Sequence, residues 1–404
     1  MKNFKKLLLW AVTAIVIGAI CGFFGVMFSR SVGFVTELRE KNTWLLFLLP
    51  LGGILSVIIY KLLRVKSIGA INVFNCAKSQ SDLPSGLAPA VFCGTTISHL
   101  FGASVGREGA ALQIGGGIAH VISKIFRFDD NTHRVSVMCG MAALFSAVFG
   151  TPLASCAFII EVIMTNLCLS AVLPILASSI AAFIVAANLG ISPEKFHIEE
   201  LPNFSLPVVL KTLIITLVCI GVGYFFCKGL AVCKKLAKKH FKNEFLRIIV
   251  GGALTVALSI TVGGYDYNGS GIEIIASVFE TGAVRYEAFA LKILFTIICV
   301  SAGYKGGEII PTLFVGTTLG ATSAALMGLP LGFGAAVGMA VLFCAATKCP
   351  VATILIACEM FGFNNWPIMT AVVLITFLTA RYEGLYAKQR TVLSLIKERK
   401  TKKA

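Results

Sequence analysis

Apolar segments separated by short polar breaks follow one another along most of the chain. The first runs from Leu7 to Phe28, and a membrane crossing needs about 20 residues. Several later segments are shorter than a full crossing, as is typical of transporters with broken membrane helices. The pattern predicts an all-α polytopic membrane protein. Its candidate segments are 7–28, 44–63, 88–101, 109–125, 134–148, 150–164, 169–189, 207–233, 246–263, 286–302, 308–327, 331–346, 350–362 and 366–380.

Composition supports a lipid environment for these segments. Of the 404 residues, 57% are hydrophobic and 13% are charged, whereas soluble domains carry about 25% charged residues. The first apolar segment is longer than the apolar core of a signal peptide and ends without a clear small-residue cleavage site. We therefore interpret it as the first membrane helix.

The net charge of +16 comes largely from basic clusters at the ends of apolar segments. The clusters cover residues 2–6, 228–242 and 388–403. By the positive-inside rule, both termini and the central basic loop are expected on the cytoplasmic side. Because the charges lie at segment ends, we prefer this interpretation to nucleic-acid binding.

Cysteine and histidine spacing predicts neither a metal site nor a cofactor. The thirteen cysteines include no CxxC pair, and most lie in apolar segments, where a free cysteine packs as a small hydrophobe. The five histidines show no ligand spacing. Residues 102–106 read GASVG and fit the GxSxG pattern of hydrolases, centred on Ser104. No partner motif supports it, so an intramembrane hydrolase is only a distant alternative and we do not expect an enzyme.

The two halves of the chain carry matching features about 200 residues apart. Residues 106–109 read GREG, and residues 306–308 read GGE. Glu161 and Glu359 each follow a proline by nine residues. A break at 67–69 is matched by another at 269–272. Two such halves suggest structural repeats, here about 40–190 and 205–380, with a binding site at their interface.

Glu108 is the strongest candidate for function. An ionisable side chain at membrane depth costs at least about 2.5–3.5 kcal/mol, so its presence favours a functional role. The flanking Gly106 and Gly109 allow backbone amides to approach an anion at a helix N-terminus. A carboxylate there could gate the site and carry a proton. The alternative is a capping glutamate paired with Arg107.

Glu308 is the repeat mate of Glu108. Gly307 precedes it, and a proline three residues later indicates a helix start, where the amides of Ile309 and Ile310 could face an anion. The alternative is a structural pair between Glu308 and Lys305.

For three further polar residues, a structural role is the preferred interpretation. Glu161 and Glu359 lie late in apolar segments, and we expect cytoplasmic-end charges or partners of basic residues. Tyr386 begins the last predicted helix, about 385–400, and an interfacial tyrosine is favoured over an anion ligand.

These motifs resemble those of the CLC family of chloride channels and anion/proton antiporters, over about residues 7–395. Residues 106–110 look like the family's GREGP motif, with Ala110 in place of proline, and residues 306–311 fall where it has GxFxP. The resemblance implies one transmembrane domain over residues 1–400, two inverted-topology repeats with broken helices, and a homodimer with one pathway per subunit. It also implies Glu108 as the gating glutamate. We expect no counterpart of the CBS domains that some members carry.

Three departures from the chloride pattern resemble the fluoride-exporting branch. The anion-coordinating serine is missing near 67–72, Val162 stands where chloride exchangers have a second glutamate, and residues 305–308 read KGGE. That branch implicates an Asn, a Phe and a Tyr, which Asn72, Phe74 and Tyr386 match. Its threonine and its Met-Phe pair are replaced here by Ile310 and residues 70–71.

We therefore predict a fluoride/proton antiporter of the plasma membrane that needs no cofactor. Its expected anion-binding residues are Asn72, Phe74, Gly106, Arg107, Gly109, Gly307, Ile309, Ile310 and Tyr386, together with Glu108 and Glu308. The alternatives are a chloride or other halide transporter and a passive anion channel.

Overall fold

The computed structural model describes residues 2–386 apart from 67–68, 80, 165–167 and 204. The described chain is all helical and contains no named β-strand, which confirms the predicted fold class. Two 3-10 segments, η1 (Thr43–Leu48) and η2 (Phe363–Asn365), accompany the α-helices. The α-helices are α1 (Lys2–Lys41), α2 (Leu49–Leu62), α3 (Ala70–Ser79), α4 (Leu87–Leu100), α5 (Glu108–Ile125), α6 (Asp130–Phe149), α7 (Pro152–Ile163), α8 (Cys168–Asn188), α9 (Leu206–His240), α10 (Glu244–Val262), α11 (Ile272–Thr281), α12 (Ala288–Ala302), α13 (Ile309–Met327), α14 (Leu331–Thr347), α15 (Pro350–Phe361) and α16 (Trp366–Thr379).

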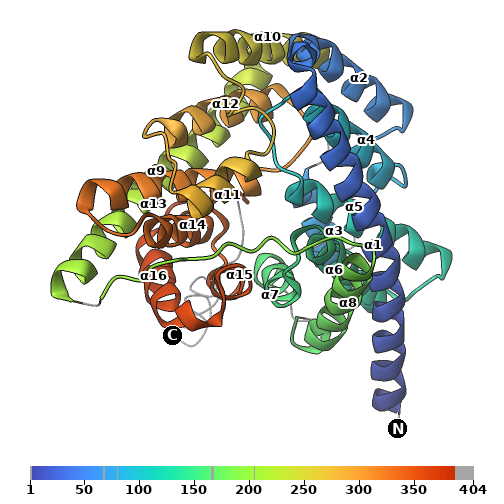
Figure 1. Cartoon of the computed structure of the whole chain (residues 1–404). Helices are drawn as coiled ribbons and strands as arrows, with labels where there is room; N and C mark the ends of the chain where they lie inside the picture. Colours follow the sequence, from blue (N-terminus) through green and yellow to red (C-terminus); the bar gives the residue numbers. More distant parts are fainter. Residues whose placement is uncertain (1, 67–68, 80, 165–167, 204, 387–404) are drawn as a thin grey trace, which may run out of the picture.

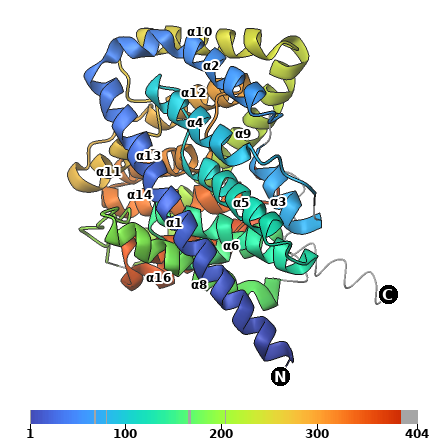
Figure 2. The same cartoon turned by 90° about the vertical axis from the view of Figure 1, so that its right-hand side faces the viewer.

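The helices differ widely in length, as a chain with broken membrane helices requires. Seven helical spans within the described residues are long and apolar enough to cross a membrane. At 1.5 Å per residue, the 35 residues of α9 extend about 50 Å, more than the roughly 30 Å of hydrocarbon in a bilayer. Such a helix must tilt or project into water. The still longer α1, of 40 residues, runs diagonally in Figure 2 and packs on α6 and α8.

Two of the described helices, α3 and α11, were not among the predicted apolar segments. Both have ten residues, and each begins at one of the matching breaks in the two halves. The C-terminal helix expected over about 385–400 lies outside the described residues from position 387 onward. The same holds for positions 67–68 of the first break.

Close backbone contacts join the same helices in each half. A Cβ atom at Gly115 on α5 would lie 2.1 Å from the carbonyl oxygen of Gly140 on α6. A Cβ atom at Gly316 on α13 would lie 2.5 Å from the carbonyl oxygen of Gly338 on α14. Small residues let membrane helices pack backbone to backbone in this way. The two hairpins hold α5 and α13 firmly in the interior.

The contact between α7 and α15 corrects the expectation that Glu161 and Glu359 are partners of basic residues. These helices lie side by side in Figure 1. The Glu161 carboxylate accepts hydrogen bonds from the N–H groups of Val351 and Ala352, at 3.1 and 2.8 Å. Glu359 accepts from Leu153 and Ala154, at 3.0 and 2.9 Å.

Each glutamate therefore caps the N-terminus of the other half's helix, where a negative charge is stabilised. The acceptors and donors of the two contacts are each 198 positions apart, so the contact has internal two-fold symmetry. Backbone amides, rather than the expected basic side chains, satisfy both carboxylates.

Candidate functional site

The N-termini of α5 and α13 meet at a two-residue antiparallel bridge. Gly106 N–H donates to the Gly307 carbonyl, and Gly307 N–H donates to the Gly106 carbonyl, both at 2.7 Å. A Cβ atom at Gly109 would lie 2.8 Å from the Cα atom of Gly307, so glycine is required for this approach. The first amides of a helix lack intrahelical partners. Those of α5 and α13 are therefore gathered in one small region between the halves.

Glu108 is the first residue of α5 and is completely buried. Its Oε2 accepts the Arg107 N–H at 3.0 Å, and Arg107 Nε lies 3.4 Å from Oε1. Within the described part of the chain, Oε1 accepts no hydrogen bond. Arg107 also binds Glu194 at 2.8 Å, so its guanidinium is shared between two carboxylates. The contact with Arg107 thus exists, yet it leaves one buried Glu108 oxygen available for another partner.

A cavity of about 330 Å³, which we call the basic cavity, adjoins this junction. Its wall includes four of the predicted site residues, and α3, α5 and α13 all begin at or near it. The positive ends of helix dipoles favour an anion. The four residues are Asn72, Gly109, Glu308 and Tyr386.

The other predicted residues do not line the basic cavity. Gly106, Gly307, Ile309 and Ile310 are buried at the two helix starts, and the side chain of Arg107 is directed to Glu194.

Asn72 and Phe74 reach the site from the first turns of α3. Asn72 is exposed on the cavity wall, and its Oδ1 accepts the Gly69 N–H at 3.3 Å. Phe74 is fully buried, and its ring meets the Tyr386 ring at 5.1 Å between centroids and 87° between planes. This edge-to-face contact holds Tyr386 at the cavity, although the two residues are 312 positions apart in sequence.

Glu308 pairs with a residue that the sequence did not single out. Its Oε1 accepts a hydrogen bond from Lys234 Nζ on α9 at 2.9 Å. The alternative pair with Lys305 is not formed, because Lys305 Nζ lies over the Tyr60 ring, 4.2 Å from its centroid. Glu308 is thus a cavity-lining carboxylate with a cationic neighbour.

Several basic residues line the cavity and give it its name. They are Lys234, Lys238, Arg247 and Lys305. From the sequence, the cluster at 228–242 predicted membrane topology alone. The basic residues are visible in the sequence, where the cluster overlaps the end of the apolar segment 207–233, but their proximity to Glu308 depends on tertiary structure.

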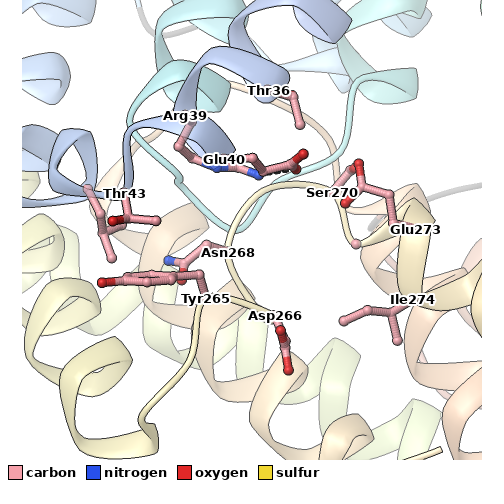
Figure 3. Close-up of a pocket in the computed structure, with 12 residues that line it drawn as sticks. Thr36, Arg39, Glu40, Thr43, Tyr265, Asp266, Asn268, Ser270, Glu273 and Ile274 are labelled. Carbon is pink, nitrogen blue, oxygen red and sulfur yellow. Dashed lines mark hydrogen bonds and ion pairs between the residues drawn. The ribbon is translucent and has the colours of Figure 1, made fainter. Parts of the chain in front are cut away.

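A second cavity, of about 210 Å³, lies at the opposite end of α2 and α10 (Figure 3). Thr43, before α2, and Tyr265, after α10, line this second cavity. Tyr60, near the end of α2, and Arg247, near the start of α10, line the basic cavity. Because α2 and α10 pack together, the two cavities are separated by the length of these helices.

The loop that precedes Glu108 runs beside the second cavity. Asn268 Nδ2 donates to the Gly102 carbonyl at 3.0 Å, and Arg39 Nη1 donates to the carbonyl of His99 at 3.2 Å. Both donors line the second cavity, and Gly109 lines the basic cavity. Glu108 therefore lies on the segment that connects them.

The hydrolase-like serine lies in a different environment. Ser104 is buried, and its hydroxyl hydrogen-bonds Thr296 at 3.1 Å, while its N–H donates to the Cys299 sulfur at 3.2 Å. No histidine hydrogen-bonds this hydroxyl in the described structure, so the geometry does not support a nucleophile.

Comparison with known proteins identifies the family. The model of the family described as "Voltage gated chloride channel" matches residues 52–381. The chain belongs to the voltage-gated chloride channel family. The matched range runs from α2 to α16 and so includes both helices that meet beside Glu108.

Individual relatives within the voltage-gated chloride channel family include proteins named for two different halides. A "Chloride/fluoride channel protein" of Pseudomonas syringae pv. tomato is 31% identical, covering 94% of this chain and 86% of the relative. An H+/Cl− exchange transporter of Vibrio vulnificus is 26% identical, over 89% of this chain and 83% of its own length. The crystal structure of a CLC-type fluoride/proton antiporter matches with a TM-score of 0.91 and 31% identity, covering 96% of this chain and 99% of that one.

Proposed function

We propose that this chain is a fluoride/proton antiporter that expels cytoplasmic fluoride by using the inward proton gradient across the plasma membrane. The observation that carries the proposal is the buried Glu108 carboxylate, located on the segment between two cavities at opposite ends of α2 and α10. Two relatives at 31% identity bear names that include fluoride, which supports the choice of ion.

Glu108 acts as gate and proton carrier in this mechanism. When ionised, its carboxylate occupies the amide-rich region at the start of α5 and excludes a free anion of the same charge. When it takes up a proton, its affinity for those amides falls, and fluoride replaces it. Return of the side chain carries the proton inward as fluoride moves outward, which couples the two flows.

Fluoride holds its hydration shell strongly, so the site must replace several hydrogen bonds together. Donors near the cavity include the Asn72 amide group, the Tyr386 hydroxyl and the first amides of α13, at Ile309 and Ile310. Phe74 can present its positive ring edge to the anion. Gly106, Gly109 and Gly307 allow the close backbone approach that this arrangement needs.

Glu308 and Lys234 tune the entrance of the site. The basic residues of the cavity raise the local concentration of small anions. The Glu308 carboxylate repels a bound anion, and only strong hydrogen bonds to the anion can offset this repulsion. Glu308 therefore disfavours an anion that forms weak hydrogen bonds. This balance favours fluoride over chloride.

The assembly and topology are part of the same proposal. We place both termini and the basic cavity on the cytoplasmic side, and we infer a homodimer with one pathway per subunit from family membership. The repeats at about 40–190 and 205–380 are supported by the symmetric caps of α7 and α15.

Reconstitution into liposomes tests the function directly. Fluoride and chloride electrodes and a lumenal pH probe would follow wild type, Glu108→Gln, and the exposed control Glu199→Gln. We expect fluoride efflux coupled to proton uptake in wild type and in the control, and loss of that coupling in Glu108→Gln. Normal coupled transport by Glu108→Gln would refute the mechanism, and chloride transport as fast as fluoride transport would refute the selectivity.

A further inference from the structure

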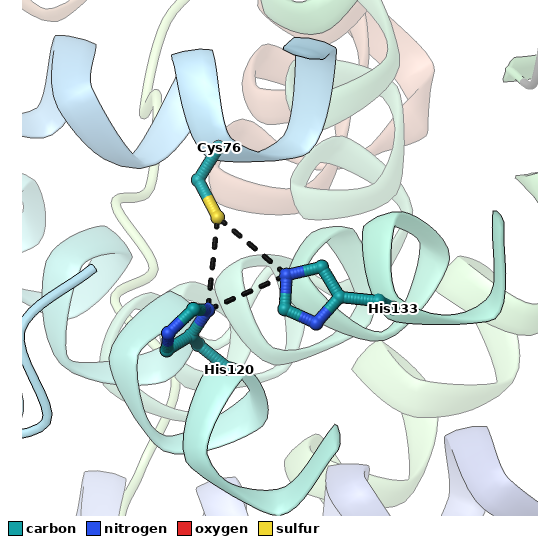
Figure 4. Close-up of side chains that lie close together, drawn as sticks. All are labelled: Cys76, His120 and His133. Atoms are coloured by element: carbon teal, nitrogen blue, oxygen red, sulfur yellow. Dashed lines mark hydrogen bonds between the residues drawn. The ribbon is translucent and has the colours of Figure 1, made fainter. Parts of the chain in front are cut away.

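A cluster of three metal-ligating side chains lies where α3 packs against α5 and α6. Cys76 on α3, His120 on α5 and His133 at the start of α6 direct their polar atoms toward one another (Figure 4). Cys76 and His120 are buried, and His133 is half-buried. Their spacing in sequence, 44 and 13 residues, matches no common metal motif.

The distances fit a tetrahedral metal ion. Cys76 Sγ lies 3.7 Å from His120 Nδ1 and 3.7 Å from His133 Nε2, and the two nitrogens are 3.3 Å apart. With Zn–N near 2.0–2.1 Å and Zn–S near 2.3 Å, tetrahedral angles require about 3.3 Å between nitrogens and about 3.6 Å between sulfur and nitrogen. The observed triangle therefore matches the one that Zn²⁺ would impose.

Neighbouring groups orient both imidazoles as ligands. Ser123 Oγ donates to the His120 carbonyl at 2.9 Å, so it accepts a hydrogen bond from His133 Nδ1 at 2.5 Å. Asp82 Oδ1, which also pairs with Lys124 at 2.5 Å, lies 3.2 Å from His120 Nε2, at ion-pair distance but outside hydrogen-bond geometry, and its negative charge favours a proton on that nitrogen. Metal-binding histidines usually donate their second N–H to such partners. The inward nitrogens, His120 Nδ1 and His133 Nε2, then both present lone pairs.

With the His120 proton on Nε2, facing Asp82, the three ligand atoms cannot satisfy one another without a metal. Two lone pairs face each other, and the single thiol proton of Cys76 can serve only one of them. A divalent cation accepts all three donor atoms, with Cys76 as a thiolate. One sulfur and two imidazole nitrogens suit Zn²⁺ and metals of similar softness.

We propose that Cys76, His120 and His133 form a binding site for Zn²⁺ or a similar transition-metal ion, with water as the fourth ligand. The sequence had predicted no metal. The site joins α3, which carries Asn72 and Phe74, to the hairpin of α5 and α6. A bound ion would therefore fix the helix that brings these two residues to the basic cavity.

Metal binding can be tested without any transport assay, so the result is independent of which anion is transported. The full chain, purified in detergent and stripped with a chelator, would be titrated with Zn²⁺ against a chromophoric chelator. We expect one equivalent per chain. Cys76→Ala and His133→Ala should lose this binding, whereas Cys93→Ala and His240→Ala, which alter exposed residues outside the cluster, should retain it.

Two further measurements separate ligand loss from misfolding. Asp82→Asn removes the carboxylate charge that faces His120 and pairs with Lys124, and it should weaken binding about 10–100-fold. Co²⁺ should give the intense visible absorption of a tetrahedral thiolate site in wild type and in Cys93→Ala, but not in Cys76→Ala. The proposal is refuted if wild type binds no Zn²⁺ at micromolar concentration, or if Cys76→Ala binds it as tightly as Cys93→Ala.

Discussion

Removal of the Glu161 carboxylate should weaken the contact between α7 and α15. The side chain accepts two hydrogen bonds, from Val351 at 3.1 Å and from Ala352 at 2.8 Å. A hydrogen bond to a charged group contributes about 1.5–3 kcal/mol. Val351 is exposed and Ala352 is buried, so the first amide can find another partner more easily than the second. We therefore expect Glu161→Ala to lower the free energy of unfolding by about 2–4 kcal/mol, the contribution of between one and two such hydrogen bonds.

Thermal unfolding in detergent, followed by size-exclusion chromatography after heating, provides the assay. Glu280→Ala serves as the matched control, because Glu280 is an exposed glutamate at the end of a helix. Glu161→Gln keeps one acceptor oxygen and should lie between the control and Glu161→Ala. Because the contact is symmetric, Glu359→Ala should have an effect similar to that of Glu161→Ala.

The reasoning fails if Glu161→Ala melts at the same temperature as Glu280→Ala. It also fails if Glu161→Ala and Glu359→Ala differ greatly, since their hydrogen bonds have nearly equal lengths.

Two substitutions at the site give further tests. Gly109→Ala should abolish transport and lower the melting temperature, because its Cβ atom would lie 2.8 Å from the Cα atom of Gly307. The control Gly33→Ala has open space around it and should behave as wild type. An active Gly109→Ala would contradict the close approach of the two helix starts. Lys234→Met leaves Glu308 without its cation and should raise the fluoride concentration for half-maximal efflux several-fold; an unchanged value would show that the pair does not shape the entrance.

The sequence predicted the long helices well, because apolar runs report directly on burial in lipid. It missed α3 and α11, which have ten residues each. The α3 sequence, AINVFNCAKS, mixes polar and apolar residues and is too short to span a bilayer. Such helices are stable only through tertiary packing, so local hydrophobicity does not reveal them.

In the candidate site too, the sequence revealed residues that stand out locally but not the partners that the fold brings to them. Glu108 and Glu308 stand out locally, because carboxylates beside glycines in apolar sequence are rare. The partner of Glu308 does not, since Lys234 lies 74 positions away in a cluster with an independent explanation. His120 and Cys76 likewise become neighbours only when α3 packs against α5.

The bridge between Gly106 and Gly307 limits how this protein can change shape. Many transporters expose their site alternately by rocking one half against the other. Here such rocking would break two 2.7 Å hydrogen bonds at the centre of the molecule and the symmetric caps of α7 and α15 as well. The low-energy route leaves the backbone fixed and swings the Glu108 side chain. Transport would then proceed at nearly constant molecular shape, and a crosslink between the two halves near the bridge should leave it intact.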